Sequence, residues 1–303
     1  MKGTTEKQKI RKEAMKLIEV YTTNSFAEEI GGGNPAAVVL EADALSEETM
    51  QFIARKIGYS ETAFVLKSSF ADLRVRYFTP VREVDLCGHA TIAVFSLLRD
   101  LNIIESGQYK LETVHDVLHI EIGADSVMME LSKPRFFEYA DPVEVADSLN
   151  IEVRDLVSEY LPQFVSTGLK DLIIPVRSKA VLDHLKPDFD KIIKLSKQYN
   201  AEGYHVFSLG REEVTAYTRN FAPSLGIMEE AATGTASGAL AAYLYKCGLL
   251  RREKLNSIVF VQGEVFGRPS VIRASIDTAE DSIRSIYVGG SIMDTKKKYV
   301  ETK

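Results

Sequence analysis

One carboxylate in this 303-residue chain stands where it could move a proton. The segment GYSETAF (58–64) places Glu61 between the end of a helical pattern and the start of an apolar strand. Burial against Tyr59 and Phe64 would raise the pKa of the carboxyl group and suit it to general acid or base catalysis. An exposed loop glutamate would have the same local sequence. Glu61 is therefore the candidate catalytic residue.

Two glycines, Gly88 and Gly234, each precede an apolar helical segment. The backbone N–H groups of a helix N-terminus are unpaired and lie at the positive end of the helix dipole, so they attract anions. If the two halves of the chain faced each other, the two helix ends would converge on one cleft and bind a carboxylate. Either glycine alone could serve only to turn the chain into its helix. The same arrangement occurs twice, which favours the binding site.

Three more side chains flank these helix ends. His89 could donate a hydrogen bond or carry a proton, or it could be satisfied by backbone groups. Glu230 could hydrogen-bond a hydroxyl or amine of a substrate, or it could only complement the helix dipole. Cys87 could be an activated thiolate. The equivalent position in the second half is Thr233, which cannot serve as the partner base of a thiol.

Composition and charge exclude several function classes. A net charge of −6 gives no positive field for nucleic acid. No apolar stretch approaches the ~20 residues of a membrane helix, and the charged segment 1–16 lacks the apolar region of a secretory signal. Two cysteines, Cys87 and Cys247, are too few for a disulfide framework. We expect a cytoplasmic protein that binds neither nucleic acid nor membranes.

A metal site is not expected either. His115 and His119 have the i, i+4 spacing of metal ligands on a helix. The sequence around them alternates like a strand, and no further ligand motif accompanies them.

The pattern of the chain indicates an α+β fold. At least a dozen short β-rich runs occur in groups rather than in strict alternation with helices, which argues against a doubly wound nucleotide-binding sheet. The helical segments at 89–101 and 235–247 are apolar on nearly all sides, so they should be buried and wrapped by strands. Further helical periodicity is found at 46–57, with Ser46 as N-cap, at 142–149 and at 190–198.

A weak internal repeat indicates two related domains. An FTP sequence before CGHA in the first half is matched by FAP before TGTA in the second half. A period this long indicates duplicated domains rather than a solenoid. We predict an N-terminal barrel-like domain at 1–131, completed by 280–303, and a C-terminal barrel-like domain at 132–279.

Five motifs taken together resemble the phenazine-biosynthesis PhzF-like family, which has the diaminopimelate epimerase-like fold. The resemblance implies two similar domains, each a barrel-like sheet around a central helix, with the active site in the cleft between them. The motifs are GGGNPAAVVL (31–40), ARKIGYSETAFVL (54–66), RYFTPVREVDLCGHATIAVF (76–95), STGLKDLIIPV (166–176) and RNFAPSLGIMEEAATGTASGALAAYL (219–244).

The resemblance also implies roles for residues. Glu61 would remove a proton from carbon and return it elsewhere on a small carboxylate substrate, without a cofactor. The substrate would be held by Gly88, His89, Glu230, Gly234 and Thr235. Asn34, Ser60, Cys87 and Thr233 are further candidate site residues. A homodimer is implied by the family alone.

Three positions depart from the family pattern, so the phenazine-pathway substrate is not assumed. Glu230 replaces the usual Asp, Ser237 the usual His, and Asn24 another Asp. Two alternatives to the isomerase stay open at this point. One is an amino-acid epimerase or racemase that uses Cys87 with another base. The other is a non-catalytic protein that binds small anions.

Overall fold

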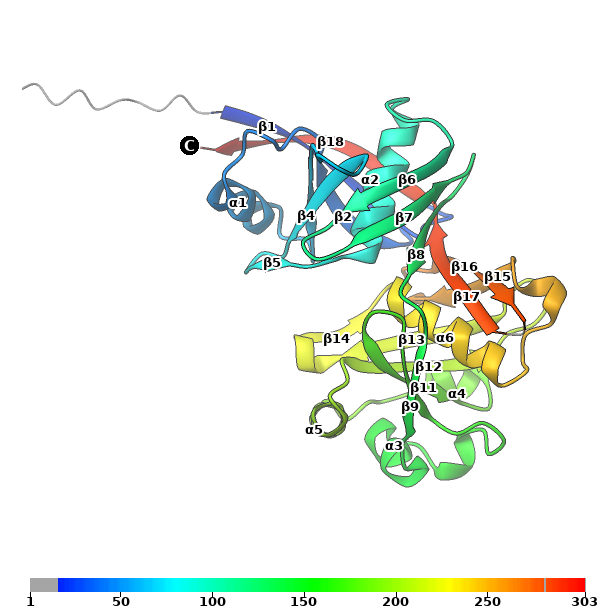
Figure 1. Cartoon of the computed structure of the whole chain (residues 1–303). Helices are drawn as coiled ribbons and strands as arrows, with labels where there is room; N and C mark the ends of the chain where they lie inside the picture. The colour runs from blue at the N-terminus through cyan, green and yellow to red at the C-terminus, as the bar shows by residue number, and fades with distance from the viewer. Residues whose placement is uncertain (1–15, 281, 303) are drawn as a thin grey trace, which may run out of the picture.

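The two halves of the molecule lie one above the other in the computed structural model, which describes residues 16–280 and 282–302 (Figure 1). The expectation that segment 1–16 is not a secretory signal therefore concerns residues that lie almost entirely outside the described part of the chain. The first half consists of β1 (Lys16–Ser25), β2 (Asn34–Val39), α1 (Glu47–Ile57), β3 (Thr62–Leu66), β4 (Leu73–Phe78), β5 (Glu83–Val84), α2 (Gly88–Asp100), β6 (Gly107–Glu112), β7 (Val117–Ile122) and β8 (Val127–Leu131).

The second half follows the same plan with longer helical insertions. The last strand returns to the first half and runs antiparallel to β1. The elements are β9 (Arg135–Tyr139), α3 (Pro142–Leu149), β10 (Gln163–Ser166), β11 (Lys170–Pro175), α4 (Lys179–Asp183), α5 (Phe189–Tyr199), β12 (Gly203–Leu209), β13 (Ala216–Ala222), β14 (Ile227–Glu230), α6 (Gly234–Lys246), β15 (Ile258–Gln262), β16 (Ser270–Ala279), β17 (Ser282–Gly290) and β18 (Ile292–Thr302).

Strand pairing repeats from one half to the other. In the first half β2 is parallel to β3, β3 antiparallel to β4, and β4 parallel to β6. In the second half β11, β12, β13 and β15 pair in the same three ways. Strands β8 and β17 pair with each other and join the two sheets. The internal repeat is therefore confirmed in the topology, whereas the predicted domain limits stay a prediction.

The central helices α2 and α6 are buried, as their all-round apolar sequences predict. Helix α2 is buried from His89 to Leu98, and α6 from Ala236 to Leu244. The two helices contact each other, and their side chains share the largest core cluster with the inner faces of both sheets. A separate cluster lies beneath α3 and α5, and a third beneath α1.

Helix α1 ends where the candidate catalytic loop begins. The hydroxyl of Ser46 accepts a hydrogen bond from the backbone N–H of Thr49, so the predicted N-cap is confirmed. Gly58 ends the helix with φ +73°, a left-handed conformation that glycine adopts at low cost. The chain then turns through Ser60 and Glu61 into β3.

Some elements carry too little sequence signal to be predicted. Helix α4 is only five residues long, and β14 only four. Strand β18 is mostly exposed and rich in lysine, so its sequence is typical of a polar tail. In the structure its residues Val300 and Thr302 are buried against the first half. No helix among the described residues has both the length and the apolar character that a membrane crossing requires.

Candidate functional site

The backbone of Glu61 is fixed by the parallel pairing of β2 and β3. Ala37 lies beside Thr62, and the N–H of Ala37 donates to the carbonyl of Glu61 over 3.3 Å. The side chain of Glu61 is 16% exposed. Its Oε2 is buried and forms no hydrogen bond of good geometry, although it lies 3.4 Å from Nε2 of His89. A carboxylate with one oxygen this poorly satisfied is well suited to accept a proton from a ligand.

His89 is the second residue of α2 and is 5% exposed. Its ring lies between Glu61 and Asn34. Oε2 of Glu61 is beside Nε2, and the amide nitrogen of Asn34 is 3.4 Å from Nδ1. The thiol of Cys87 lies 3.3 Å from Nδ1 and can donate to it, so the tautomer that fits accepts at Nδ1 and carries its proton on Nε2, facing Glu61. Ser60 adds a hydroxyl 3.5 Å from Nε2.

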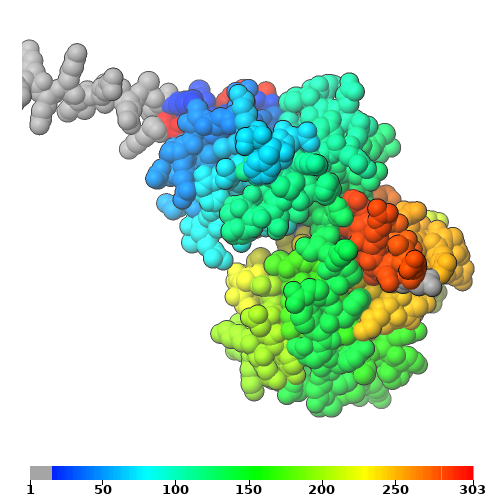
Figure 2. Space-filling model, in the orientation of Figure 1, coloured from blue at the N-terminus to red at the C-terminus, as the bar shows by residue number. Residues whose placement is uncertain are grey.

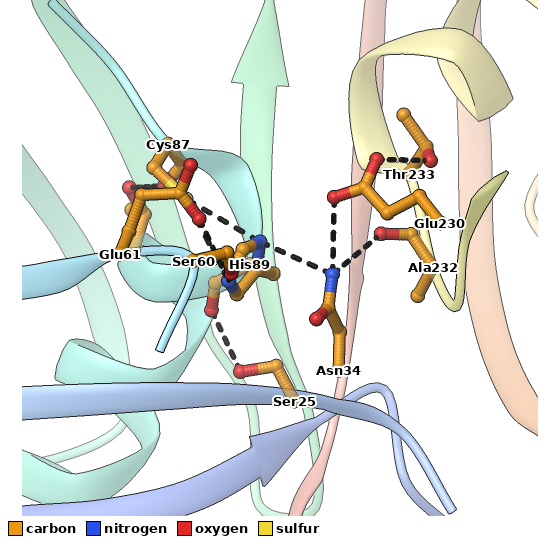
Figure 3. Close-up of polar contacts among 10 residues, drawn as sticks. Ser25, Asn34, Ser60, Glu61, Cys87, His89, Glu230, Ala232 and Thr233 are labelled. Atoms are coloured by element: carbon orange, nitrogen blue, oxygen red, sulfur yellow. Dashed lines mark hydrogen bonds and ion pairs between the residues drawn. The ribbon is translucent and has the colours of Figure 1, made fainter. Parts of the chain in front are cut away.

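Asn34 joins the two halves of the molecule. It begins β2, and its amide nitrogen donates to Oε1 of Glu230 and to the carbonyl of Ala232, both over 3.1 Å. Figure 3 shows Asn34 between His89 on one side and Glu230 on the other. The site is thus built across the boundary between the halves, as the converging helix ends require.

Glu230 ends β14, just before α6. Its Oε2 accepts a hydrogen bond of 2.6 Å from the hydroxyl of Thr233. Burial raises the pKa of Glu230 and the Glu61 carboxylate adds to this, whereas His89, Thr233 and Asn34 oppose it. Glu230 is thus held by donors from both halves.

Cys87 is the N-cap of α2 and is 7% exposed. Its sulfur lies 3.3 Å from Nδ1 of His89. Burial raises the pKa of the thiol well above its usual value, and the nearby Glu61 carboxylate acts in the same direction. This direction is opposite to the one that an activated thiolate requires.

Gly88 and Gly234 are the first residues of α2 and α6, and neither N-cap side chain bonds to its helix. Neither glycine has a positive φ. A Cβ at Gly88 would meet only the Met129 side chain at 3.5 Å, which is ordinary contact. Backbone geometry therefore does not demand glycine at these positions, and the small residue leaves the helix ends open to a ligand. Thr235, also predicted to bind substrate, is half-buried in the first turn of α6.

Two residues that support the site were not predicted from the sequence. Gln262, on β15, donates from Nε2 to the carbonyl of Glu230 over 2.8 Å and accepts at Oε1 from the N–H of Thr233. Ser25, on β1, donates to the carbonyl of His89 over 2.7 Å. Both come from strands remote in sequence, and no motif marks them.

Two of the three side chains that depart from the family pattern form hydrogen bonds within the protein. Ser237 donates to the carbonyl of Thr233 over 2.8 Å. Asn24 lies 3.4 Å from Asp294 through its amide nitrogen. Neither contacts the Glu61–His89 pair through a hydrogen bond described in the structure.

Among the described residues, Glu61, Cys87 and His89 also form a group that could hold a metal ion. A carboxylate oxygen, the thiol sulfur and an imidazole nitrogen lie within 4.8 Å of one another. His119, by contrast, lies on β7, as the alternating sequence predicts, and belongs to no such group in the described part of the chain.

The surface is indented between the halves. Figure 2 shows a notch between the blue and cyan residues of the first half and the yellow residues of the second. Two further hollows lie elsewhere on the surface. One, of about 460 Å³, is lined by residues that include His119, Glu130 and Arg284, and the other lies between α3 and α4. The site residues described above line neither hollow, so the size of a hollow does not locate the site.

Comparison with known proteins places this chain among isomerases. Residues 23–295 match the family model of phenazine biosynthesis-like proteins (PhzC-PhzF). An uncharacterized isomerase of Clostridium acetobutylicum is 35% identical over 90% of this chain and 94% of its own. The trans-2,3-dihydro-3-hydroxyanthranilate isomerase of Pseudomonas aeruginosa is 28% identical over 88% of this chain and 94% of its own.

Solved structures give the same result for the fold. A PhzF-family protein of Bacillus anthracis matches with a TM-score of 0.84 and 32% identity, covering 94% of this chain and 99% of that one. A hydroxyproline epimerase from Agrobacterium vitis matches with a TM-score of 0.60 at 12% identity, covering 94% and 92%. The predicted α+β architecture of two similar domains, the diaminopimelate epimerase-like fold, is confirmed.

Proposed function

The chain belongs to the phenazine biosynthesis-like family and is an isomerase, and we propose that it moves a proton between carbon atoms of a small carboxylate substrate without a cofactor. Glu61 is the proton carrier in this proposal. The observation that carries it is the Glu61–His89 pair, which lies at the N-terminus of α2 beside Asn34, the residue that donates to Glu230 of the second half.

Glu61 has the placement that a carbon base needs. Its Oε2 is buried, has no well-formed hydrogen bond, and lies 3.4 Å from the ring of His89. An ionised Glu61 would accept a proton from substrate carbon, and the resulting acid would return the proton to another carbon. The N–H of His89, 3.4 Å from Oε2, would place a positive dipole beside the ionised carboxylate.

The negative charge that develops on the substrate needs fixed donors. Removing a proton beside a carboxylate builds an enolate-like charge, and preorganised N–H groups are the usual means of stabilising it. The first turns of α2 and α6 would provide such donors, with Gly88 and Gly234 leaving the approach unobstructed.

Glu230 and Thr235 orient the substrate in this proposal. Glu230 is held by Asn34 and Thr233 at the edge of the cleft, so it would accept a hydrogen bond from a hydroxyl or amino group of the substrate. The relative from Pseudomonas aeruginosa is named for a substrate that carries both groups. A substrate with a carboxylate and one neighbouring donor therefore fits both sides of the site. A homodimer also remains part of the proposal.

A racemase that uses Cys87 is less well supported. Its thiol is buried beside a carboxylate, which disfavours the thiolate. The equivalent residue in the other half, Thr233, is engaged with Glu230. Two opposed acid/base groups are therefore not available at these positions.

The test is deuterium incorporation at carbon, followed by NMR in D₂O with a panel of small carboxylates that includes trans-2,3-dihydro-3-hydroxyanthranilate. We expect exchange with the wild-type protein and a loss of roughly 10²–10⁴-fold in Glu61→Gln, since that is the range for removing a general base. The matched control is Glu48→Gln, the same change at an exposed position of α1, which should exchange at the wild-type rate. Exchange that survives Glu61→Gln would refute the role of Glu61.

A further inference from the structure

We propose that Glu61, Cys87 and His89 form a binding site for a thiophilic divalent cation, with Zn²⁺ as the probe, and that the bound ion closes the site to substrate. The proposal goes beyond the isomerase function, because it concerns a ligand that the protein binds without substrate. It rests on three ligand types that are brought together from two elements, the loop before β3 and the first turn of α2.

Two of the three distances between ligand atoms suit a tetrahedral ion, and all three are within 4.8 Å. Nε2 of His89 lies 3.4 Å from Oε2 of Glu61 and 3.8 Å from the sulfur of Cys87. Ligand distances of about 2.1 Å to nitrogen and oxygen and 2.3 Å to sulfur place tetrahedral partners about 3.4 to 3.6 Å apart. The atoms therefore need shifts of only a few tenths of an ångström on these two edges of the tetrahedron.

The surroundings complete the coordination. The fourth ligand in this proposal is a water molecule, as in other sites with three protein ligands. The backbone of His89 is held by Ser25, so the ring is already placed for the ion. Binding releases the thiol proton to solvent and shifts the ring proton of His89 from Nε2 to Nδ1, because the ion binds the thiolate and the unprotonated Nε2.

The second half offers a built-in contrast. Thr62 pairs with Phe78 in the first half as Tyr204 pairs with Phe221 in the second, so Gly203 corresponds to Glu61. The residues at the start of α6 that correspond to Cys87 and His89 are Thr233 and Thr235. The equivalent place therefore lacks all three ligands, and the cation site does not follow from the fold itself.

An ion at this position would stop proton transfer. The lone pair of Glu61 that accepts the proton would be bound to the ion, and the water on the ion would occupy the path from the helix ends. The cation and the substrate would therefore compete for one site.

The experiment measures binding directly, with untagged protein and no substrate. Zn²⁺ is titrated against the protein in competition with a chromophoric zinc indicator, and Co²⁺ is used as a spectroscopic substitute. We expect one equivalent of tightly bound ion and, with Co²⁺, a thiolate-to-cobalt charge-transfer band. Cys87→Ser should lose this band and weaken binding at least tenfold. The matched control, Cys247→Ser, changes the half-buried thiol at the end of α6 and should alter neither.

Two results would overturn the proposal. One is wild-type protein that does not compete with the indicator, and the other is a charge-transfer band that persists in Cys87→Ser. If Cys87→Ser does not fold by circular dichroism, His89→Gln takes its place and should weaken binding by the same order. Since no turnover is measured, failure here leaves the isomerase proposal untouched, and loss of exchange in Glu61→Gln says nothing about the ion.

Discussion

The two halves of the molecule share a framework but differ in what their sheets enclose. Arg76 makes a bidentate pair with Glu83 and lies 5.1 Å from the ring centre of Phe78. At the equivalent place Arg219 makes a bidentate pair with Glu229 and lies 5.0 Å from the ring of Phe221. Strand register, ion pair and aromatic contact therefore all recur.

The interiors behind this framework differ. Register aligns Ala36, Ala63 and Tyr77 of the first half with Asp171, His205 and Asn220 of the second. At these three positions the first interior is thus mainly apolar and the second is polar. Duplication has kept the strands that form each wall while the halves have diverged, with the proposed proton carrier in one half and a buried titratable cluster in the other.

Breaking the repeated ion pair should reveal how unequal the two copies are. In Arg219→Met we expect a loss of about 3–5 kcal/mol in the free energy of unfolding, because Glu229 and the carbonyls of Leu182 and Leu185 lose a buried partner. Arg76→Met should cost only about 1 kcal/mol, because its carboxylate partners reach water. Urea unfolding of both variants measures the difference.

A double variant sharpens the same comparison. Replacing Arg219 by Met and Glu229 by Leu together should recover most of the lost stability, since no charge is then left unpaired. Equal losses in the two single variants would show that the ion pairs are equivalent in spite of their different burial.

The sequence predicted what is local and left out what depends on distant strands. The N-cap Ser46 and the buried helices α2 and α6 could be predicted, because helix capping and apolarity on all sides of a helix depend only on neighbouring residues in the sequence. Gln262 could not, because it reaches the site only through the pairing of β13 with β15. Asp171 was visible in the second copy of a motif, but only strand register shows that it faces the interior.

The polar interior of the second half should produce two opposed pH dependences. Burial, reinforced by Glu202 and Glu230, raises the pKa of Asp171 from 3.8 to about 7. Its folded form therefore holds a proton that the unfolded chain has lost, and stability falls as pH rises from about 4 to about 7. Burial lowers the pKa of His205 from 6.5 to about 4, so stability falls as pH drops through that window.

The two contributions nearly cancel in the wild-type protein between pH 4.5 and 6.5. Asp171→Asn should leave the histidine slope, so that stability relative to wild type rises by about 2 kcal/mol across this range. In His205→Gln the stability relative to wild type should fall by a similar amount across the same range. Unfolding free energies at both pH values, with wild type subtracted, give the two slopes. Parallel slopes in the two variants would contradict the assignment.

The smallest effect concerns one equivalent pair of side chains, Tyr77 and Asn220. Tyr77→Phe removes a hydrogen bond of 2.6 Å to Thr91, whose hydroxyl still donates to the carbonyl of Cys87, so the cost should be about 1 kcal/mol. Asn220→Leu removes the 3.0 Å partner of Nδ1 of His205, whose Nε2 is already buried without a partner. An imidazole left without any partner should cost about 2 kcal/mol. Unfolding measured at pH 7, where His205 is neutral, ranks the two. If Tyr77→Phe were the costlier change, the first half would depend more on this hydrogen bond than the second half does on the Asn220–His205 bond. The contrast between the two interiors would then not extend to their stability.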